Sequence, residues 1–272
     1  MPTEMVDQWK SVDAAFSKQS AQFDKYDSLN PVLQAWRERI YAHVDQFIKP
    51  NSKILELNAG TGIDALRFAR LGHTVHAIDI SIGMIKKMNE KISLYSLSDR
   101  ITTQQISFDQ LNQVNGKFDF VFSNFGGLNC IDDLNKVTRH LPELLNEGAL
   151  ITWVIMPRIS PWEWLWLLKG KFKDAFRRFQ KNGAMANVEG RTFLTYYYSL
   201  KEIRKSFGPQ FQLIKSEGLG VFSPPPSATN FVKQFPRTFN FLDQGDQSIS
   251  KLYPFTRWGD HLVLTFRLKK AK

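Results

Sequence analysis

The segment Lys53-Ile-Leu-Glu-Leu-Asn-Ala-Gly-Thr-Gly62 decides the fold, because a short apolar run passes directly into a glycine-rich turn. The apolar run predicts a strand over 53–57, the turn predicts a loop over 58–62, and a helix is expected over 64–71. Glycines in such a turn let a ligand approach the backbone, and the following helix offers unpaired N–H groups. The segment therefore predicts a strand–loop–helix unit that binds a nucleotide-like ligand.

Strands and helices continue to alternate after this unit. Apolar or alternating runs predict strands at 74–80, 101–106, 118–123 and 148–156, with helices at 82–92 and 134–145. Alternation of this kind is typical of an α/β fold whose parallel sheet is covered on both faces. Nearer the C-terminus we expect strands at 192–199, 211–218 and 261–268, a helix at 200–207, and an irregular loop at 221–246.

The N-terminal 50 residues have a different character. Residues 1–30 are polar with scattered aromatic side chains, and Asn30-Pro31 marks a turn, because the residue before a proline avoids the helical region. A helix with one apolar face follows, since apolar residues recur there at spacings of three and four up to Phe47. We expect residues 1–50 to be an N-terminal helical segment that covers the ligand site.

The alternation breaks between residues 158 and 191. Trp162, Trp164 and Trp166 cluster there, followed by a run rich in lysine and arginine, and no strand is evident. This segment is predicted to be a helical cap insertion. The predicted organisation is therefore an N-terminal segment (1–50), a cofactor-binding core (51–157), the cap (158–191) and the C-terminal part of the sheet (192–272).

Composition sets broader limits. The chain is 43% hydrophobic and 23% charged, as expected of a globular protein. It contains no run of eighteen apolar residues and begins with no recognisable signal sequence, which predicts a cytoplasmic protein without a transmembrane helix. A lone cysteine, Cys130, predicts neither a disulfide nor a zinc site. The net charge of +10 favours anionic partners, or simply keeps the surface soluble.

A family resemblance makes the prediction of a nucleotide-like ligand more specific. Glu56-Leu-Asn-Ala-Gly-Thr-Gly62, followed by His76-Ala-Ile-Asp-Ile-Ser81 and Met84, resembles the class I S-adenosylmethionine-dependent methyltransferases. Weaker likenesses at 106–111, 117–129 and 141–150 extend the resemblance over residues 53–156. It implies S-adenosyl-L-methionine as the cofactor and a Rossmann-like, seven-stranded, mostly parallel sheet with helices on both faces and the last strand antiparallel. One departure is Asn58, where many members have glycine; asparagine tolerates left-handed backbone angles.

The resemblance also implies a set of cofactor-binding residues. The methionine moiety would be lined by Glu56, Asn58, Ala59, Gly60 and Gly62. Asp79 would accept the ribose hydroxyls, a geometry that also suits the ribose of NAD. Around the adenine and the sulfonium the implied residues are Ile80, Met84, Phe108, Asp109, Asn124 and Phe125. Tyr26 lies in a segment that would fold over the cofactor carboxylate.

The chemistry needs few further groups. A sulfonium is already an activated electrophile, so the protein must mainly align the acceptor with the methyl group. His261 and His140 are candidate general bases, but neither is assigned, and no metal site is predicted.

The acceptor is predicted to be a small molecule, apolar or anionic. An Asn/Asp-Pro-Pro-Tyr motif is absent at Asn124, which disfavours methylation of nucleic-acid bases. The tryptophans and basic residues of the cap suggest peripheral contact with a membrane. Alternative interpretations are an RNA methyltransferase, an NAD-dependent oxidoreductase and a binding module without turnover; the oligomeric state is left open.

Overall fold

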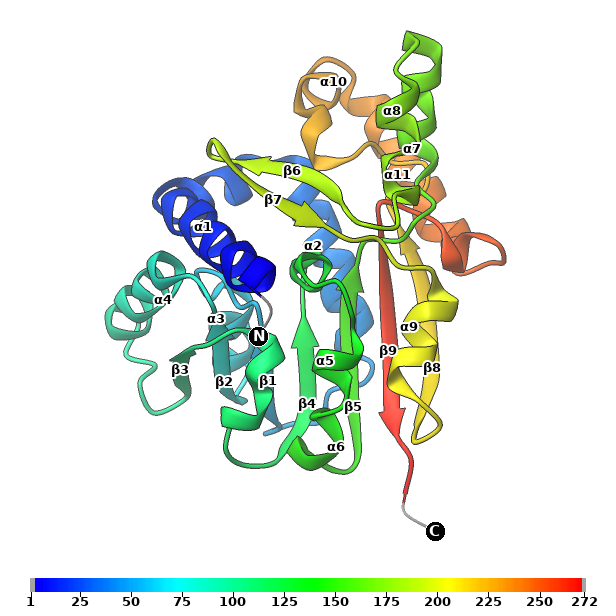
Figure 1. Cartoon of the computed structure of the whole chain (residues 1–272). Helices are drawn as coiled ribbons and strands as arrows, with labels where there is room; N and C mark the ends of the chain where they lie inside the picture. The colour runs from blue at the N-terminus through cyan, green and yellow to red at the C-terminus, as the bar shows by residue number, and fades with distance from the viewer. Residues whose placement is uncertain (1–2, 271–272) are drawn as a thin grey trace.

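A seven-stranded sheet of order β3-β2-β1-β4-β5-β9-β8 runs through the computed structural model, which describes residues 3–270 (Figure 1). The first five strands in this order pair in parallel, whereas β9 is antiparallel to both β5 and β8. The predicted Rossmann-like sheet with an antiparallel last strand is therefore confirmed. Its strands are β1 (Lys53–Leu57), β2 (Thr74–Asp79), β3 (Ile101–Gln105), β4 (Phe118–Ser123), β5 (Leu145–Ile155), β8 (Phe211–Leu219) and β9 (His261–Leu268).

Each face of the sheet carries its own apolar core, because alternate side chains of a strand point to opposite faces. Ile54 of β1 and Phe120 of β4 belong to one core, while Leu55 and Val121 belong to the other. The first core is covered by α2 (Pro31–Val44), α3 (Ile63–Arg70), α4 (Ile82–Leu94) and α11 (Pro236–Ile249). The second is covered by η1 (Phe108–Gln113), α5 (Asn135–Thr138), α6 (Leu141–Leu144) and α9 (Leu200–Phe207).

A long N-terminal helix, α1 (Thr3–Leu29), lies across the carboxyl ends of the central strands. Next to it runs a separate two-stranded hairpin, β6 (Ala184–Val188) and β7 (Arg191–Thr195), which contacts α1 (Figure 1). The two elements form a roof above the loops that follow β1, β2 and β4. No helix among residues 3–270 is both long and apolar enough to cross a bilayer.

The hairpin corrects the prediction for the cap. Residues 158–191 were expected to be helical throughout, and 192–199 to join the main sheet. The helical part is confined to α7 (Pro161–Trp164), η3 (Leu165–Lys169), α8 (Phe172–Ala175) and η4 (Arg177–Phe179). β6 follows, and it pairs only with β7. Glu189 and Gly190 both adopt positive φ angles (52° and 79°), which is the conformation that a tight two-residue hairpin turn requires.

Two other segments also differ from expectation. The single helix predicted at 134–145 is two short pieces, α5 and α6, and Pro142 stands in the first turn of the second piece. Proline is tolerated there but not in a helix interior, because it lacks an N–H donor. The predicted irregular loop at 221–246 instead contains η5 (Pro226–Ala228), α10 (Thr229–Gln234) and most of α11; η2 (Gly127–Cys130) and η6 (Phe255–Arg257) complete the list of elements.

The stack around Phe207 of α9 offers a test of this packing. Its ring is fully buried. The centre of the ring lies 3.9 Å from the ring centre of Phe266 and 4.5 Å from that of Trp153. We expect Phe207→Ala to lower the free energy of unfolding by about 3–5 kcal/mol in urea denaturation. The matched control, Phe241→Ala, removes a ring that is 75% exposed and should change stability by less than about 0.5 kcal/mol. Equal effects would contradict the assigned packing.

Candidate active site

A cavity of about 310 Å³ lies under the roof formed by α1 and the β6–β7 hairpin. Its floor is made by the loops at the carboxyl ends of β1, β2 and β4, which is where ligands bind in open parallel sheets. Eight of the residues predicted to hold a cofactor line this cavity: Asn58, Gly60, Asp79, Ile80, Met84, Phe108, Asn124 and Phe125.

The glycine-rich loop after β1 turns through left-handed backbone angles. Asn58, Gly60 and Gly62 have φ angles of 46°, 57° and 79°. A Cβ atom at Gly62 would lie only 2.5 Å from Met88 Cγ, so this glycine is needed for close packing on α4. A Cβ atom at Gly60 would meet no atom within 4 Å, so the backbone there faces open space. Ala59 is buried beneath the turn.

Asn58 keeps the turn in place without a glycine. Its side-chain amide donates a hydrogen bond to the backbone oxygen of Asn124 (2.9 Å), and its side-chain oxygen accepts one from the Ser123 hydroxyl (2.6 Å). A Cβ atom at Gly127 would fall 2.3 Å from Asn58 Cγ. Thus the loops after β1 and β4 are joined directly, and Gly127 is small because this side chain occupies the space beside it.

Asp79 joins the loop to the end of β2. One carboxylate oxygen accepts from the Gly60 backbone N–H and the other from the Ser81 backbone N–H, both at 2.8 Å. Burial raises the pKa of Asp79 to about 6, and the two backbone hydrogen bonds oppose this rise. Each carboxylate oxygen has a lone pair left to accept a hydroxyl from a ligand.

Glu56 lies at the end of β1 and is almost completely buried. It does not line the cavity, and its Oε2 atom has no hydrogen-bond partner among the described residues. Burial, together with the nearby Asp64 and Asp79, raises the pKa of Glu56 well above its ordinary value, against the influence of Arg37 and Lys91. An unpaired buried carboxyl is costly, so this oxygen is suited to accept from a ligand that donates protons.

Phe108 and Asp109 lie on the other side of the cavity, in η1. Trp9 of α1 packs its ring edge-on to Phe108 and donates a hydrogen bond from Nε1 to Asp109 Oδ2 (3.2 Å). The second oxygen of Asp109, Oδ1, is buried and has no partner among the described residues. It is therefore a free acceptor, although Asp109 itself is behind the cavity wall.

Asn124 and Phe125 follow β4 and are fixed by a buried ionic network. Asn124 donates from its side-chain amide to Asp64 (2.9 Å), and Arg37 binds the other oxygen of Asp64 (2.8 Å). The guanidinium of Arg37 also pairs with Asp27 and lies over the Phe125 ring, 4.8 Å from its centre. Helices α1, α2 and α3 thereby position the two residues.

The structure does not bring Tyr26 to the cavity. Half of its side chain is exposed, and its hydroxyl accepts a hydrogen bond from Asn30 at the start of α2. It lines a separate shallow surface hollow.

The cavity residues that the sequence interpretation missed come mainly from the roof. From α1 they are Trp9, Val12, Phe16 and Phe23, and from the hairpin they are Ala186, Val188, Phe193 and Thr195. A signal for the first group was present, because three aromatic residues recur at intervals of seven, which places them on one face of a helix. No comparable signal placed the hairpin.

Neither candidate base is established as catalytic. His140 lies next to α6 on the far side of the sheet edge, where burial and Arg139 lower its pKa. His261 is buried at the start of β9; its Nδ1 lies 2.9 Å from Asp260, and its Nε2 has no partner among the described residues. It lies behind Gly126 and is not a cavity-lining residue. Among residues 3–270, no group of three or more histidine, cysteine or acidic side chains is placed to hold a metal ion.

The unused polar groups fit one kind of ligand. Glu56 Oε2 and Asp109 Oδ1 are buried acceptors without donors, Asp79 can accept two hydroxyls, and Gly60 leaves room for the ligand against the backbone. S-adenosylmethionine carries an ammonium group, a ribose diol and an adenine amine, which are donors of the required types. Its sulfonium would lie between them, near Asn124 and Phe125.

Comparisons with known proteins agree with this geometry. A family model described as "Methyltransferase domain" matches residues 54–148. The chain is 31% identical over 110 residues to the ribosomal protein L11 methyltransferase of Desulfitobacterium hafniense (39% of this chain, 35% of that protein). It is 29% identical over 134 residues to the demethylmenaquinone methyltransferase of Corynebacterium efficiens (47% and 54%). The chain thus spans only about a third to a half of the length of these curated relatives.

Likeness in structure extends further than likeness in sequence. A crystal structure of an S-adenosylmethionine-dependent methyltransferase from Listeria monocytogenes superposes with a TM-score of 0.60 at 13% identity, covering 88% of this chain and 99% of that one. At this identity the match shows the fold. The family model over residues 54–148 and this shared fold together confirm the predicted resemblance to the class I, Rossmann-like, S-adenosylmethionine-dependent methyltransferases.

Replacing Asp79 tests the position assigned to the ribose. We expect Asp79→Ala to weaken the binding of S-adenosylhomocysteine by roughly 1.5–3 kcal/mol in calorimetry, the scale of hydrogen bonds to a charged group. Asp99→Ala removes an exposed carboxylate just before β3 and should leave the affinity for S-adenosylhomocysteine unchanged. Unchanged affinity in Asp79→Ala would show that the ribose lies elsewhere.

The raised pKa of Asp79 also predicts a pH dependence. Since ionised Asp79 is the better acceptor, affinity for S-adenosylhomocysteine should fall below pH 6, by up to about tenfold per pH unit. Without ligand the sign is opposite: the raised pKa favours the protonated form in the folded protein, so this group's contribution to stability is lost as the pH rises from 3.8 to about 6. Calorimetry of S-adenosylhomocysteine binding across pH 5–8 measures the change in affinity, with Asp79→Asn as the control that lacks this titration. Identical affinity profiles of the two proteins would contradict the predicted pH dependence.

Proposed function

We propose that this protein transfers a methyl group from S-adenosylmethionine to an apolar small-molecule acceptor. The observation that carries the proposal is the composition of the cavity: among the residues that the structure describes, Asp79 is the only charged side chain that lines it. The remaining wall toward the roof is apolar, with Phe16, Phe193 and Met156 among its residues. Such a wall favours an uncharged, apolar acceptor over an anionic one, because a buried anion without a partner is costly.

The chemistry that the cofactor supplies is an electrophilic methyl group on a positively charged sulfur. When bound, the cofactor would give its methyl group to a nucleophilic atom of the acceptor as the sulfur–methyl bond breaks; a hydroxyl acceptor would lose its proton to solvent, and S-adenosylhomocysteine would remain. The chain contributes alignment and exclusion of water. Asn124 and Phe125 are held through Asp64 and Arg37, and apolar side chains of α1 line the cavity, where they would limit access of water.

The names of the two relatives point to two different classes of methyl acceptor. One relative acts, by its name, on demethylmenaquinone, an apolar quinone, and the other on a ribosomal protein. The apolar cavity wall favours the first class. A polyanionic acceptor such as RNA has no cation to meet inside this cavity. The methyltransferase match favours S-adenosylmethionine over NAD. Contact with a membrane surface would bring the protein to an apolar acceptor.

A labelling experiment tests the acceptor class. The protein is incubated with S-adenosylmethionine that carries a tritiated methyl group. Each reaction contains one class of acceptor: quinols or phenols of increasing apolar chain length, ribosomal protein, or transfer RNA. We expect label in the organic phase from the quinol or phenol reactions. Label that appears only in precipitated protein or RNA would contradict the proposal, and absence of S-adenosylhomocysteine binding would contradict its cofactor.

A matched pair of hairpin variants locates the acceptor. Ala186 lines the cavity, whereas its neighbour Met185 is 65% exposed, because adjacent strand residues point to opposite faces. We expect Ala186→Phe to reduce methyl transfer at least tenfold while S-adenosylhomocysteine affinity is retained, and Met185→Phe to affect neither. Equal transfer by the two variants would show that the acceptor does not bind under the hairpin.

A further inference from the structure

The outer side of the cap exposes large apolar side chains to solvent. Leu168 is 85% exposed and Phe172 65%, and Trp164, Trp166, Phe176 and Phe179 are each more than one third exposed. These six residues, called the cap face below, lie between Trp164 and Phe179, within or directly beside the short helical pieces of the cap. A contiguous apolar patch is unfavourable in water and marks a contact surface in soluble proteins.

A basic groove borders the cap face. It has a volume of about 800 Å³ and is lined by five cations, Arg158, Lys201, Arg204, Lys205 and Arg257, and by no carboxylate. Lys201, Arg204 and Lys205 are exposed and form no ion pair with any described residue, whereas Arg158 is paired with Glu202. A concentration of unpaired positive charge predicts an anionic partner.

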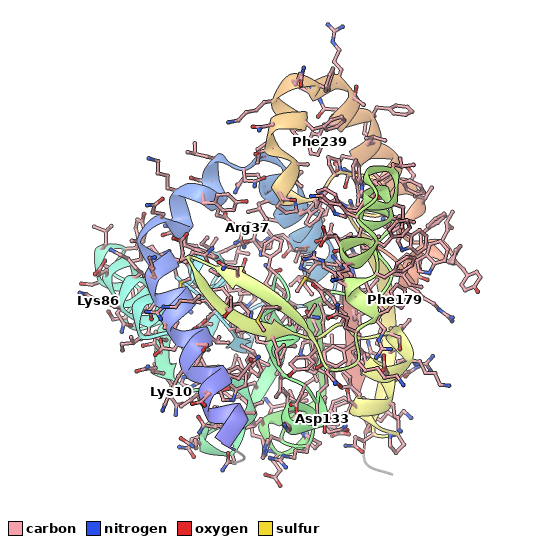
Figure 2. The ribbon with its side chains drawn as sticks, turned by 45° about the horizontal axis from the view of Figure 1, so that its top comes forward. Lys10, Arg37, Lys86, Asp133, Phe179 and Phe239 are labelled. Atoms are coloured by element: carbon pink, nitrogen blue, oxygen red, sulfur yellow. The ribbon has the colours of Figure 1, made fainter. Side chains whose placement is uncertain are left out.

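The cap face and the basic groove form one continuous surface, because they share a residue and touch through aromatic rings. Phe179 belongs to both. Trp164 lies against Trp258 of the groove with the ring centres 6.3 Å apart, and Lys171 lies over the Trp166 ring at 4.9 Å. Figure 2 shows Phe179 on the side of the molecule opposite Lys86. The surface is therefore separate from the cofactor cavity, whose lining includes none of these residues.

Packing within the chain does not account for this surface. The Trp164–Trp258 contact leaves Trp164 36% exposed, and Leu168 and Phe172 remain largely uncovered. The groove cations alone would fit the phosphates of RNA as well as those of lipids. The exposed Leu168 and Phe172 decide between them, because aliphatic and phenyl groups gain by entering hydrocarbon, and tryptophans beside lysine and arginine suit the headgroup layer.

We propose that the cap face and the basic groove together dock on an anionic lipid bilayer. Leu168 and Phe172 enter the acyl boundary, the aromatic rings lie at the level of the headgroups, and Lys201, Arg204 and Lys205 contact the lipid phosphates. Docking goes beyond the proposed methyl transfer, since the surface does not include the cavity. It would supply an apolar acceptor from the membrane to the cavity under the adjoining β6–β7 hairpin.

Flotation with vesicles tests the docking without any turnover. The full chain is mixed with vesicles of phosphatidylcholine alone, or with roughly one third phosphatidylglycerol. We expect binding to the anionic vesicles that weakens as salt rises, and little binding to the neutral ones. Arg204→Ala with Lys205→Ala should weaken binding about 25-fold, since each cation near an anionic surface contributes a factor of about five. Leu168→Ser with Phe172→Ser should weaken it at least tenfold.

Matched controls come from exposed residues outside the cap face and the basic groove. Lys10→Ala with Lys86→Ala removes two exposed cations, and Leu29→Ser with Leu94→Ser removes two exposed leucines. We expect both control pairs to bind vesicles like the unaltered protein. Absence of binding to anionic vesicles, equal losses in test and control pairs, or salt-dependent binding to transfer RNA without vesicle binding would each overturn the proposal.

The two proposals fail in different ways. Calorimetry with S-adenosylhomocysteine on the same preparations shows whether every variant is folded and whether the cofactor site is intact. Vesicle binding without S-adenosylhomocysteine binding would overturn the methyl-transfer proposal and leave docking standing. The reverse result would overturn docking alone.

Discussion

The buried carboxylate of Asp79 is the interaction on which the rest of the site depends. It accepts one backbone N–H from the glycine loop after β1 and one from the turn before α4, so it fixes both elements to the end of β2. Burying a negative charge is unfavourable, as its raised pKa shows, and two backbone donors compensate only partly. Under the proposed function, the ribose diol of the cofactor would complete the compensation. The loop is therefore held ready for the ligand before the ligand arrives, which lowers the entropic cost of binding.

A second buried network performs the same task for the loop after β4. Arg37 bridges Asp27 of α1 and Asp64 of α3, and Asp64 in turn holds Asn124. Buried charges of this kind are tolerated when they are paired and hydrogen-bonded on all sides. Because α1 contributes Asp27 to this network and Trp9 to the cavity wall, the helix that covers the cavity also fixes Asn124, which is proposed to lie beside the methyl group of the cofactor. The same ionic network therefore holds both α1 and the loop after β4 in place.

The sequence predicted this site as far as local rules extend. Turn chemistry predicts Gly60, and the strand end predicts Asp79, whereas the family resemblance implied residues such as Phe108. Eight of all the predicted residues line one cavity. Tyr26 was predicted from its neighbours in the chain, but helix geometry turns its side chain toward Asn30. Roof residues such as Phe193 escaped prediction because their position depends on the β6–β7 pairing. That pairing depends on a turn at Glu189-Gly190. The turn lies inside a segment that the sequence analysis predicted to be helical because of its tryptophans and lysines.

The cap insertion acquires a different meaning from the structure. As a wholly helical lid it would have covered the acceptor with Trp162, Trp164 and Trp166. Instead, the acceptor end is closed by the hairpin, through Ala186, Val188 and Phe193, and the tryptophans lie outside the cavity. Since a lid has no need of exposed leucine and phenylalanine, the outward face of the cap requires a separate physical explanation. The two proposals provide one: the hairpin of the insertion would select an apolar molecule, and the outer cap face, with the basic groove beside it, would hold the protein where such molecules are dissolved.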